Sequence, residues 1–238
     1  MSVYTPHLAP IVVLAFVGTV GLLVLCAFVA IIGAFRKSRS AVIGAIGAGA
    51  TILLGYASIL LGLSLLSRDI EITQGAWKYF CELDCHIAYK VGGMRVASSV
   101  GPEMQSISTN GRFVIVQLKT WFDPTTISPR RGNGALTPNG RVITLRDGRG
   151  REFMPSEKSE SILMAAKLRS TPLRVALRPG ESYVSYIVFE IPNDATKLRL
   201  WLTSSDEESF LIWGNENSPW HGKSYFSLPE VQQVIATN

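Results

Sequence analysis

Two long apolar stretches, residues 9–35 and 41–67, occupy most of the first 67 positions of the chain. Neither stretch contains Asp, Glu, Lys or Arg, and only residues 36–40 separate them. A helix needs roughly 20 apolar residues to cross the hydrocarbon core of a bilayer, so each stretch is long enough to span it with some tilt. Because long helices in soluble cores usually carry a polar stripe, the pattern predicts a transmembrane helical hairpin over residues 1–67.

A cleaved signal peptide is the alternative interpretation of the first stretch. Such a peptide has a basic start, a short apolar region and small residues at its cleavage site. Residues 1–8 contain no Lys or Arg, and the basic residues Arg36, Lys37 and Arg39 follow the stretch instead. Basic loops stay in the cytoplasm, which places the loop 36–40 there. The N-terminus and the C-terminal domain are then expected outside, with the chain crossing an inner or plasma membrane twice.

Small residues recur at four-residue spacing along the second stretch. This spacing lets helix backbones approach closely in lipid. It predicts packing within the hairpin and leaves open self-association, or contact with a protein partner, through the same faces. The three sets are Ala41, Ala45 and Gly49; Gly44 and Ala48; and Ser58 and Gly62.

From residue 86 onward, apolar and polar positions alternate, which is typical of half-buried strands. A helical spacing is confined to residues 156–169, and Asp147-Gly148 between two apolar runs is a hairpin signal. Several strands separated by turn residues predict an all-β antiparallel sandwich over residues 86–238. The predicted strands are 87–91 continuing through 94–100, 112–122, 141–145, 151–153, 183–191 and 198–203.

Aromatic residues lie on both sides of these strands. In the juxtamembrane segment 68–85, Trp77, Tyr79 and Phe80 either lie at the level of the lipid headgroups or begin the core of the outer domain. The tail from residue 209 to 238 is too aromatic for a disordered linker. We expect the tail to add a last strand to the sandwich or to pack on it.

Three successive motifs characterise residues 112–203. A long alternating strand, RFVIVQLKTWFD, precedes an Asp-Gly hairpin, VITLRDGRGREFMPS, and then LRPGESYVSYIVFEIPNDATKLRLWL, with its Pro-Gly-Glu turn and Leu-x-Leu strand. This succession resembles a family of immunoglobulin-like modules of unknown function in secreted lipoproteins and membrane proteins of bacteria and archaea. The resemblance implies an immunoglobulin-like sandwich and carries over no catalytic residue. Phe122-Asp123 departs from it, because the family often has Asn or Lys-Asn there. The last part of the pattern is matched by Phe189, Pro192, Leu198 and Leu200.

The distribution of charge along the chain bears on which kinds of partner it can bind. The chain has 23 Lys and Arg against 18 Asp and Glu; three of the basic residues and none of the acids lie in residues 1–67. The remainder is nearly neutral, which argues against nucleic-acid binding. Arginines beside Gly-rich turns either solvate a hairpin or form a patch for anionic headgroups or an acidic partner. These arginines are Arg130, Arg131, Arg146, Arg149 and Arg151.

Cys81 and Cys85 are the strongest candidates for chemistry. An oxidising location outside the membrane favours a disulfide between them. Residues four apart on a straight strand are separated by about 13 Å, so the bond requires residues 82–84 to form a turn.

Three other readings of this cysteine pair stay open. With His86 it supplies only three metal ligands, and His221 becomes a fourth only if the tail folds back. Covalent haem uses Cys-x-x-Cys-His, which is one residue shorter than the spacing here. A redox-active dithiol is disfavoured by the intervening acids Glu82 and Asp84, because reactive thiols need nearby positive charge.

No hydrolase elbow, zinc-protease helix or phosphate-binding loop motif occurs in the sequence. A Ser-His-Asp site would have to use His7, His86 or His221, and no sequence motif around these histidines supports one. We therefore expect a non-enzymatic, membrane-anchored, extracytoplasmic binding or scaffold module without metal or cofactor. The alternative is an accessory subunit or thiol-redox protein of the cell envelope that uses Cys81 and Cys85.

Overall fold

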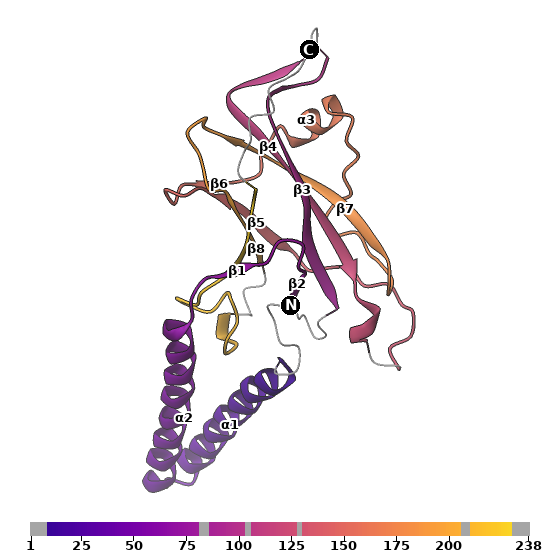
Figure 1. The fold of residues 1–238 in the computed structure, drawn as a ribbon. Coiled ribbons are helices and arrows are strands. Elements are labelled where there is room, and N and C mark those ends of the chain that lie inside the picture. The colour runs from indigo at the N-terminus through magenta and orange to yellow at the C-terminus, as the bar shows by residue number, and fades with distance from the viewer. Residues whose placement is uncertain (1–8, 81–85, 103–105, 128–129, 206–209, 230–238) are drawn as a thin grey trace. The chain divides into compact units, whose positions relative to one another are not determined.

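The computed structural model shows a helix pair and a β-sheet domain (Figure 1). It describes residues 9–80, 86–102, 106–127, 130–205 and 210–229. These residues form two compact units. The helical unit contains residues 9–68 and 210–222, and the β unit contains residues 69–205 and 223–229. The coarse prediction of a helical hairpin followed by a β domain is confirmed.

Helix α1 spans Ala9–Phe35 and helix α2 spans Arg39–Leu66, with a tight turn at residues 36–38 between them. Both helices are long and apolar enough to cross a bilayer. Their sequences explain their length, because neither helix contains a proline beyond its first turn and neither interior carries a charge.

Of the three sets of small residues, the set Ala41, Ala45 and Gly49 lies at the contact between the two helices, whereas a Cβ atom on Gly44 or Gly62 would meet no atom within 4 Å. Ala45 is buried at this contact. A Cβ atom on Gly33 would lie 3.1 Å from Cβ of Ala41, and one on Gly49 would lie 3.6 Å from Cβ of Cys26. Glycine at these two positions therefore allows the backbones to approach closely.

The β unit contains two sheets and a short helix. The first sheet has the order β1-β9-β8-β5-β6 and the second has the order β2-β3-β4-β7. Neighbouring strands are antiparallel except for the parallel pair β1–β9, which the prediction of an antiparallel sandwich did not include. The strands of the first sheet are β1 (Ile70–Ile72), β9 (Ser224–Ser227), β8 (Arg199–Ser204), β5 (Arg141–Arg146) and β6 (Glu152–Phe153). Those of the second are β2 (Lys78–Phe80), β3 (Ile87–Val100), β4 (Ile107–Phe122) and β7 (Ser182–Ile191).

Strand β4 contacts the first sheet on one face and helix α3 on the other. Its central run is apolar on both faces, so both faces are buried. Val114, Val116 and Leu118 join a core shared by the two sheets. Phe113 and Ile115 point to the opposite face, where helix α3 (Ser159–Ala165) covers them with Ile162 and Leu163. A strand buried on both faces needs a covering layer on each side, and α3 supplies the second one.

Other predicted elements are confirmed with adjusted bounds. The runs 87–91 and 94–100 are one strand, β3, with register shifts at Val91/Gly93 and Ala97/Ser99. The helical spacing at residues 156–169 corresponds to the shorter helix α3. The 3-10 turn η2 (Pro124–Thr126) follows Asp123, whose side chain accepts a hydrogen bond from the backbone N–H of Thr125.

The aromatic residues of the segment 68–85 belong to the β unit. The Trp77 ring stacks on Trp121 at 5.1 Å, and Phe80 meets Tyr89 edge to face at 5.5 Å. Of the two interpretations offered by the sequence, these contacts favour the first core residues of the domain. Described residues of this segment form the edge strands β1 and β2, not a separate linker.

The aromatic tail divides between the two units. Residues 224–227 form β9, which confirms the predicted last strand. Residues 210–222 belong instead to the helical unit, whereas the sequence analysis assigned the whole tail to the β domain.

Candidate functional site

The turn between β5 and β6 gathers three of the five predicted arginines. Asp147 is buried at this turn, and its Oδ1 accepts hydrogen bonds from the backbone N–H groups of Arg149 and Arg151, both at 2.9 Å. The Nε of Arg151 donates to Oδ2 of Asp147 at 2.7 Å. Arg149 and Arg151 also pair with Asp194, and Arg146 pairs with Glu152.

These contacts change the electrostatics of the turn. Burial by itself raises the pKa of the Asp147 carboxyl, but the hydrogen bonds from Arg151 and Arg149 outweigh it and lower the pKa overall. The hydrogen bond from Arg151 likewise lowers the pKa of Asp194. Both acids are therefore held as carboxylates beside the arginines. The positive charge of Arg146, Arg149 and Arg151 is balanced locally by acidic neighbours.

The other two predicted arginines lie in the loop between η2 and β5. The Arg131 guanidinium lies 4.8 Å from the centroid of the Phe122 ring and donates to the carbonyl oxygen of Gly134 at 2.8 Å. Arg130 is exposed beside it. The five arginines thus lie in two separate loops of the β unit, and a patch for anionic partners stays a prediction.

Cys81 and Cys85 lie outside the residues that the structure describes, so their disulfide also stays a prediction. His86, which follows them, is buried in the β unit. Its ring stacks on Phe122 at 5.5 Å, and its Nδ1 lies 2.7 Å from Oγ1 of Thr126. Among the described residues, no group of three or more His, Cys, Asp or Glu could hold a metal ion.

A buried lysine connects the two sheets, and sequence reasoning missed it. Lys78 on β2 is buried, and its Nζ donates to the carbonyl oxygens of Leu202 at 2.7 Å and Ser224 at 3.1 Å. These acceptors lie on β8 and β9 of the opposite sheet. No local pattern marks this cation as buried, because its acceptors are 124 and 146 residues away in the chain.

The next residue of β2, Tyr79, pairs with a carboxylate that follows β4. Oη of Tyr79 donates to Oδ2 of Asp123 at 2.6 Å. Burial, together with the hydrogen bond to Asp123 and its negative charge, raises the pKa of the Tyr79 hydroxyl. Tyr79 therefore stays protonated, which suits a structural link between β2 and the end of β4 and not a general base.

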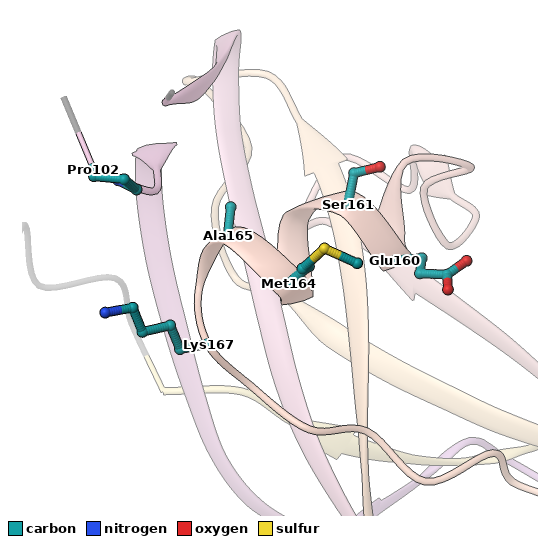
Figure 2. A pocket seen from close by; sticks show the side chains of 6 residues that line it. All are labelled: Pro102, Glu160, Ser161, Met164, Ala165 and Lys167. Carbon is teal, nitrogen blue, oxygen red and sulfur yellow. The ribbon is translucent and has the colours of Figure 1, made fainter. Parts of the chain in front are cut away.

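A pocket of about 450 Å³ lies between helix α3 and the segment that follows β3 (Figure 2). Pro102, Met164 and Ala165 contribute apolar surface, and Glu160 and Lys167 contribute opposite charges. Figure 2 shows Pro102 on one segment and the other labelled side chains on or just after α3. We call this site the α3 pocket. Its lining residues are about 60 positions apart in the chain, so no local sequence pattern could have revealed it.

No protein-family model matches the chain, and no curated protein matches it. Three solved structures are similar to the chain at low identity and low TM-score. A conserved hypothetical protein from Bacillus anthracis is 13% identical over 49% of this chain and 82% of its own, with a TM-score of 0.37. The yjhA protein from Bacillus subtilis is 14% identical over 66% and 98%, with a TM-score of 0.37. The secreted protein MPT63 from Mycobacterium tuberculosis is 12% identical over 67% and 97%, with a TM-score of 0.40. Similarity at this level carries no argument about function.

Proposed function

We propose that the chain is a membrane-anchored, extracytoplasmic module that binds a partner and catalyses no reaction. One observation carries the proposal: the outward-facing side chains of α1 and α2 are apolar and exposed. Exposed apolar surface of this extent is unfavourable in water and favourable in lipid. Large exposed apolar residues include Leu14, Val17, Leu25, Phe28 and Ile31 on α1, and Ile43, Ile46, Leu54 and Leu65 on α2.

The turn between the helices supports the orientation that we propose. Arg36, Lys37 and Arg39 are exposed at this turn. Basic residues near a spanning helix favour the cytoplasmic side. With the turn inside, the C-terminal end of α2 and the whole β unit lie outside.

An immunoglobulin-like relationship is the second part of the proposal. The chain passes from the second sheet to the first after β4, back at β7, and again to the first at β8. Such exchange between two antiparallel sheets is common to immunoglobulin-like sandwiches, and it agrees with the motif resemblance of residues 112–203. The parallel pair β1–β9 is an addition to that pattern.

The α3 pocket is the proposed place for the partner. Its apolar lining with a few charged groups at the margin is typical of binding sites. Met164 is exposed beside Glu160 and Lys167, which present opposite charges. This arrangement suits an apolar side chain of a protein segment that carries charges of its own.

The orientation is tested by accessibility in intact cells. A cysteine-reactive, membrane-impermeant reagent should modify a cysteine introduced at exposed Met154, and should leave one introduced at Lys37 unmodified until the membrane is permeabilised. The parent chain, whose cysteines are Cys26, Cys81 and Cys85, is treated in parallel and gives the background labelling that is subtracted. If only the cysteine introduced at Lys37 is modified in intact cells, the orientation is opposite to the one that we propose.

Partner binding is tested by site-specific photocrosslinking of the full chain. A photoreactive residue at Met164 should give one discrete adduct, and the same residue at Met154 should give none. The adduct should disappear when Lys167 is changed to Glu, which reverses the charge beside the pocket. An adduct that forms equally from both positions, or that survives Lys167→Glu, would remove the α3 pocket as the binding site.

A further inference from the structure

Residues 210–222, the aromatic segment, are attached to helix α2 at two levels. Oη of Tyr56 donates to the carbonyl oxygen of Leu211 at 2.5 Å, and the Tyr56 and Trp213 rings pack at a tilt of 31° with their centroids 4.8 Å apart. At the end of the helix, the backbone N–H of Gly222 donates to Oγ of Ser67 at 2.6 Å. The segment therefore runs alongside the last three turns of α2.

The depth of this attachment follows from helix geometry. Tyr56 comes 17 residues after Arg39, the first residue of α2, which corresponds to about 25 Å along the axis. Phe16, whose ring lies 6.3 Å from that of Tyr56, comes 19 residues before the end of α1, or about 28 Å. The hydrocarbon core is about 30 Å thick, so with the basic turn at one boundary these aromatics lie just inside the other.

The aromatic segment presents apolar side chains outward at this level. Phe210 is 41% exposed and Leu211, whose carbonyl oxygen accepts from Tyr56, is 48% exposed; Trp220, which is 74% exposed, comes two residues before Gly222 at the end of α2. The rings of Phe16, Tyr56 and Trp213 form a continuous aromatic group beside them. Tryptophan and tyrosine are enriched where headgroups meet acyl chains, because their rings combine an apolar body with a polar group.

Backbone N–H and C=O groups close to lipid need hydrogen-bond partners within the protein. Several such groups of the aromatic segment are paired with each other or with its side chains. The N–H of Asn215 donates to the carbonyl oxygen of Ile212, and the N–H of Ser218 donates to that of Asn215. Oγ of buried Ser218 donates to the carbonyl oxygen of Ile212 at 2.8 Å. Oδ1 of Asn215 accepts from the N–H of Asn217 at 2.9 Å.

We infer that the aromatic segment is a membrane-interface element of the outer leaflet, with Phe210 and Leu211 inserted at the headgroup–acyl boundary and Trp220 on the headgroup side of the same boundary. The inference rests on the proposed function, since it requires α1 and α2 to span the bilayer. Lipid is the occupant of this surface because the segment is fixed to α2 at the depth of the interface. At that depth α2 also exposes apolar side chains, among them Leu53, Leu54 and Ile59.

The test measures tryptophan fluorescence of the full-length protein in phosphatidylcholine liposomes that contain lipids brominated at shallow or deep acyl positions. We expect the shallow bromines to quench more strongly than the deep ones. Trp220→Phe should remove a large share of the quenched signal. The matched control is Trp201→Phe, which removes a tryptophan buried in β8 and should leave the quenched signal unchanged.

An alkaline carbonate wash of the same liposomes separates failure of this inference from failure of the proposed function. Protein that resists extraction while Trp220 is quenched by aqueous iodide and not by brominated lipid overturns the inference and leaves the anchor intact. Shielding of Trp220 from both quenchers also overturns it, because a second copy of the chain then covers the segment. Extraction by carbonate overturns both proposals, since the helices are then not integrated.

Discussion

Arg151 donates hydrogen bonds to both carboxylate oxygens of Asp147, from its backbone N–H to Oδ1 at 2.9 Å and from its Nε to Oδ2 at 2.7 Å. The guanidinium of the same arginine pairs with Asp194, which precedes β8. One side chain thus connects the β5–β6 turn to a second loop of the β unit. The Asp-Gly turn is rigid because a buried carboxylate occupies its centre.

Asp147→Ala should destabilise the β unit by roughly 2 kcal/mol, because it leaves two backbone N–H groups and the Arg151 Nε without their acceptor. The measurement is thermal unfolding of the full chain in a non-ionic detergent. Asp194→Ala is the matched control and should cost less, since Asp194 is half exposed and pairs with the partly exposed side chains of Arg149 and Arg151. Equal losses from the two variants would contradict this account.

Acid should destabilise the same turn. The pKa values of Asp147 and Asp194 lie below the ordinary value of 3.8 in the folded chain. Their contribution to stability is therefore complete above that value and is lost as the pH falls through the folded-state pKa values. As the pH is lowered below about 4, the melting temperature of the wild type should fall more steeply than that of the Asp147→Asn/Asp194→Asn double variant. Parallel curves would show that other carboxylates determine the acid response.

Gly111→Ala should destabilise the second sheet by about 2–3 kcal/mol. A Cβ atom at Gly111 would overlap the carbonyl oxygen of Ile191 on β7, and neither backbone can move without disturbing the ladder. Gly134→Ala is the control, because no atom lies within 4 Å of the added carbon. Its melting temperature should match the wild type, and a comparable drop would attribute the effect to glycine replacement in general.

Lys78→Met should cost about 2–3 kcal/mol, because it leaves the carbonyl oxygens of Leu202 and Ser224 without their charged donor. Lys90→Met removes a lysine that lies 4.7 Å above the Trp77 ring and should cost only about 0.5–1 kcal/mol. Thermal unfolding again provides the measurement. If Lys78→Met is as stable as the wild type, apolar packing replaces the link between the sheets.

Cys81 and Cys85 should form an inert disulfide, as expected for a domain outside the membrane. Titration of the full-length protein with redox buffers, read out by thiol labelling and mass spectrometry, should give a reduction potential below about −300 mV. A higher value would favour the alternative of a thiol-redox protein. Cys26 in α1 provides an internal reference, because it is a free thiol.

The sequence predicted those parts of the fold that a local apolar period encodes. The uncharged runs gave α1 and α2, and the alternation of residues 112–122 gave the central part of β4. Strands β1 and β2 were missed because three residues are too few to show a period, and long-range pairing defines them. The parallel pairing of β1 with β9 has no local signal either.

In the candidate sites, too, the sequence indicated the local features and not the long-range contacts. Arginines beside Gly-rich turns were visible, but their carboxylate partners were not, since Asp194 is more than 40 residues from Arg149 and Arg151. Aromatic composition showed that the tail is ordered without showing what residues 210–222 contact. That assignment depends on Tyr56, an inconspicuous residue of an apolar helix.

Strand β1 begins four residues after α2 ends, yet its partner in the first sheet is β9, which begins at Ser224. A ribosome adds roughly 5–20 residues per second, so the partner strand emerges on the order of ten seconds or more after β1. During that interval Ile72, which is buried in the finished core, lacks its neighbour Phe226. Biosynthesis therefore leaves an unpaired edge close to the end of α2, and a chain terminated before residue 224 would present that edge to proteases and to aggregation.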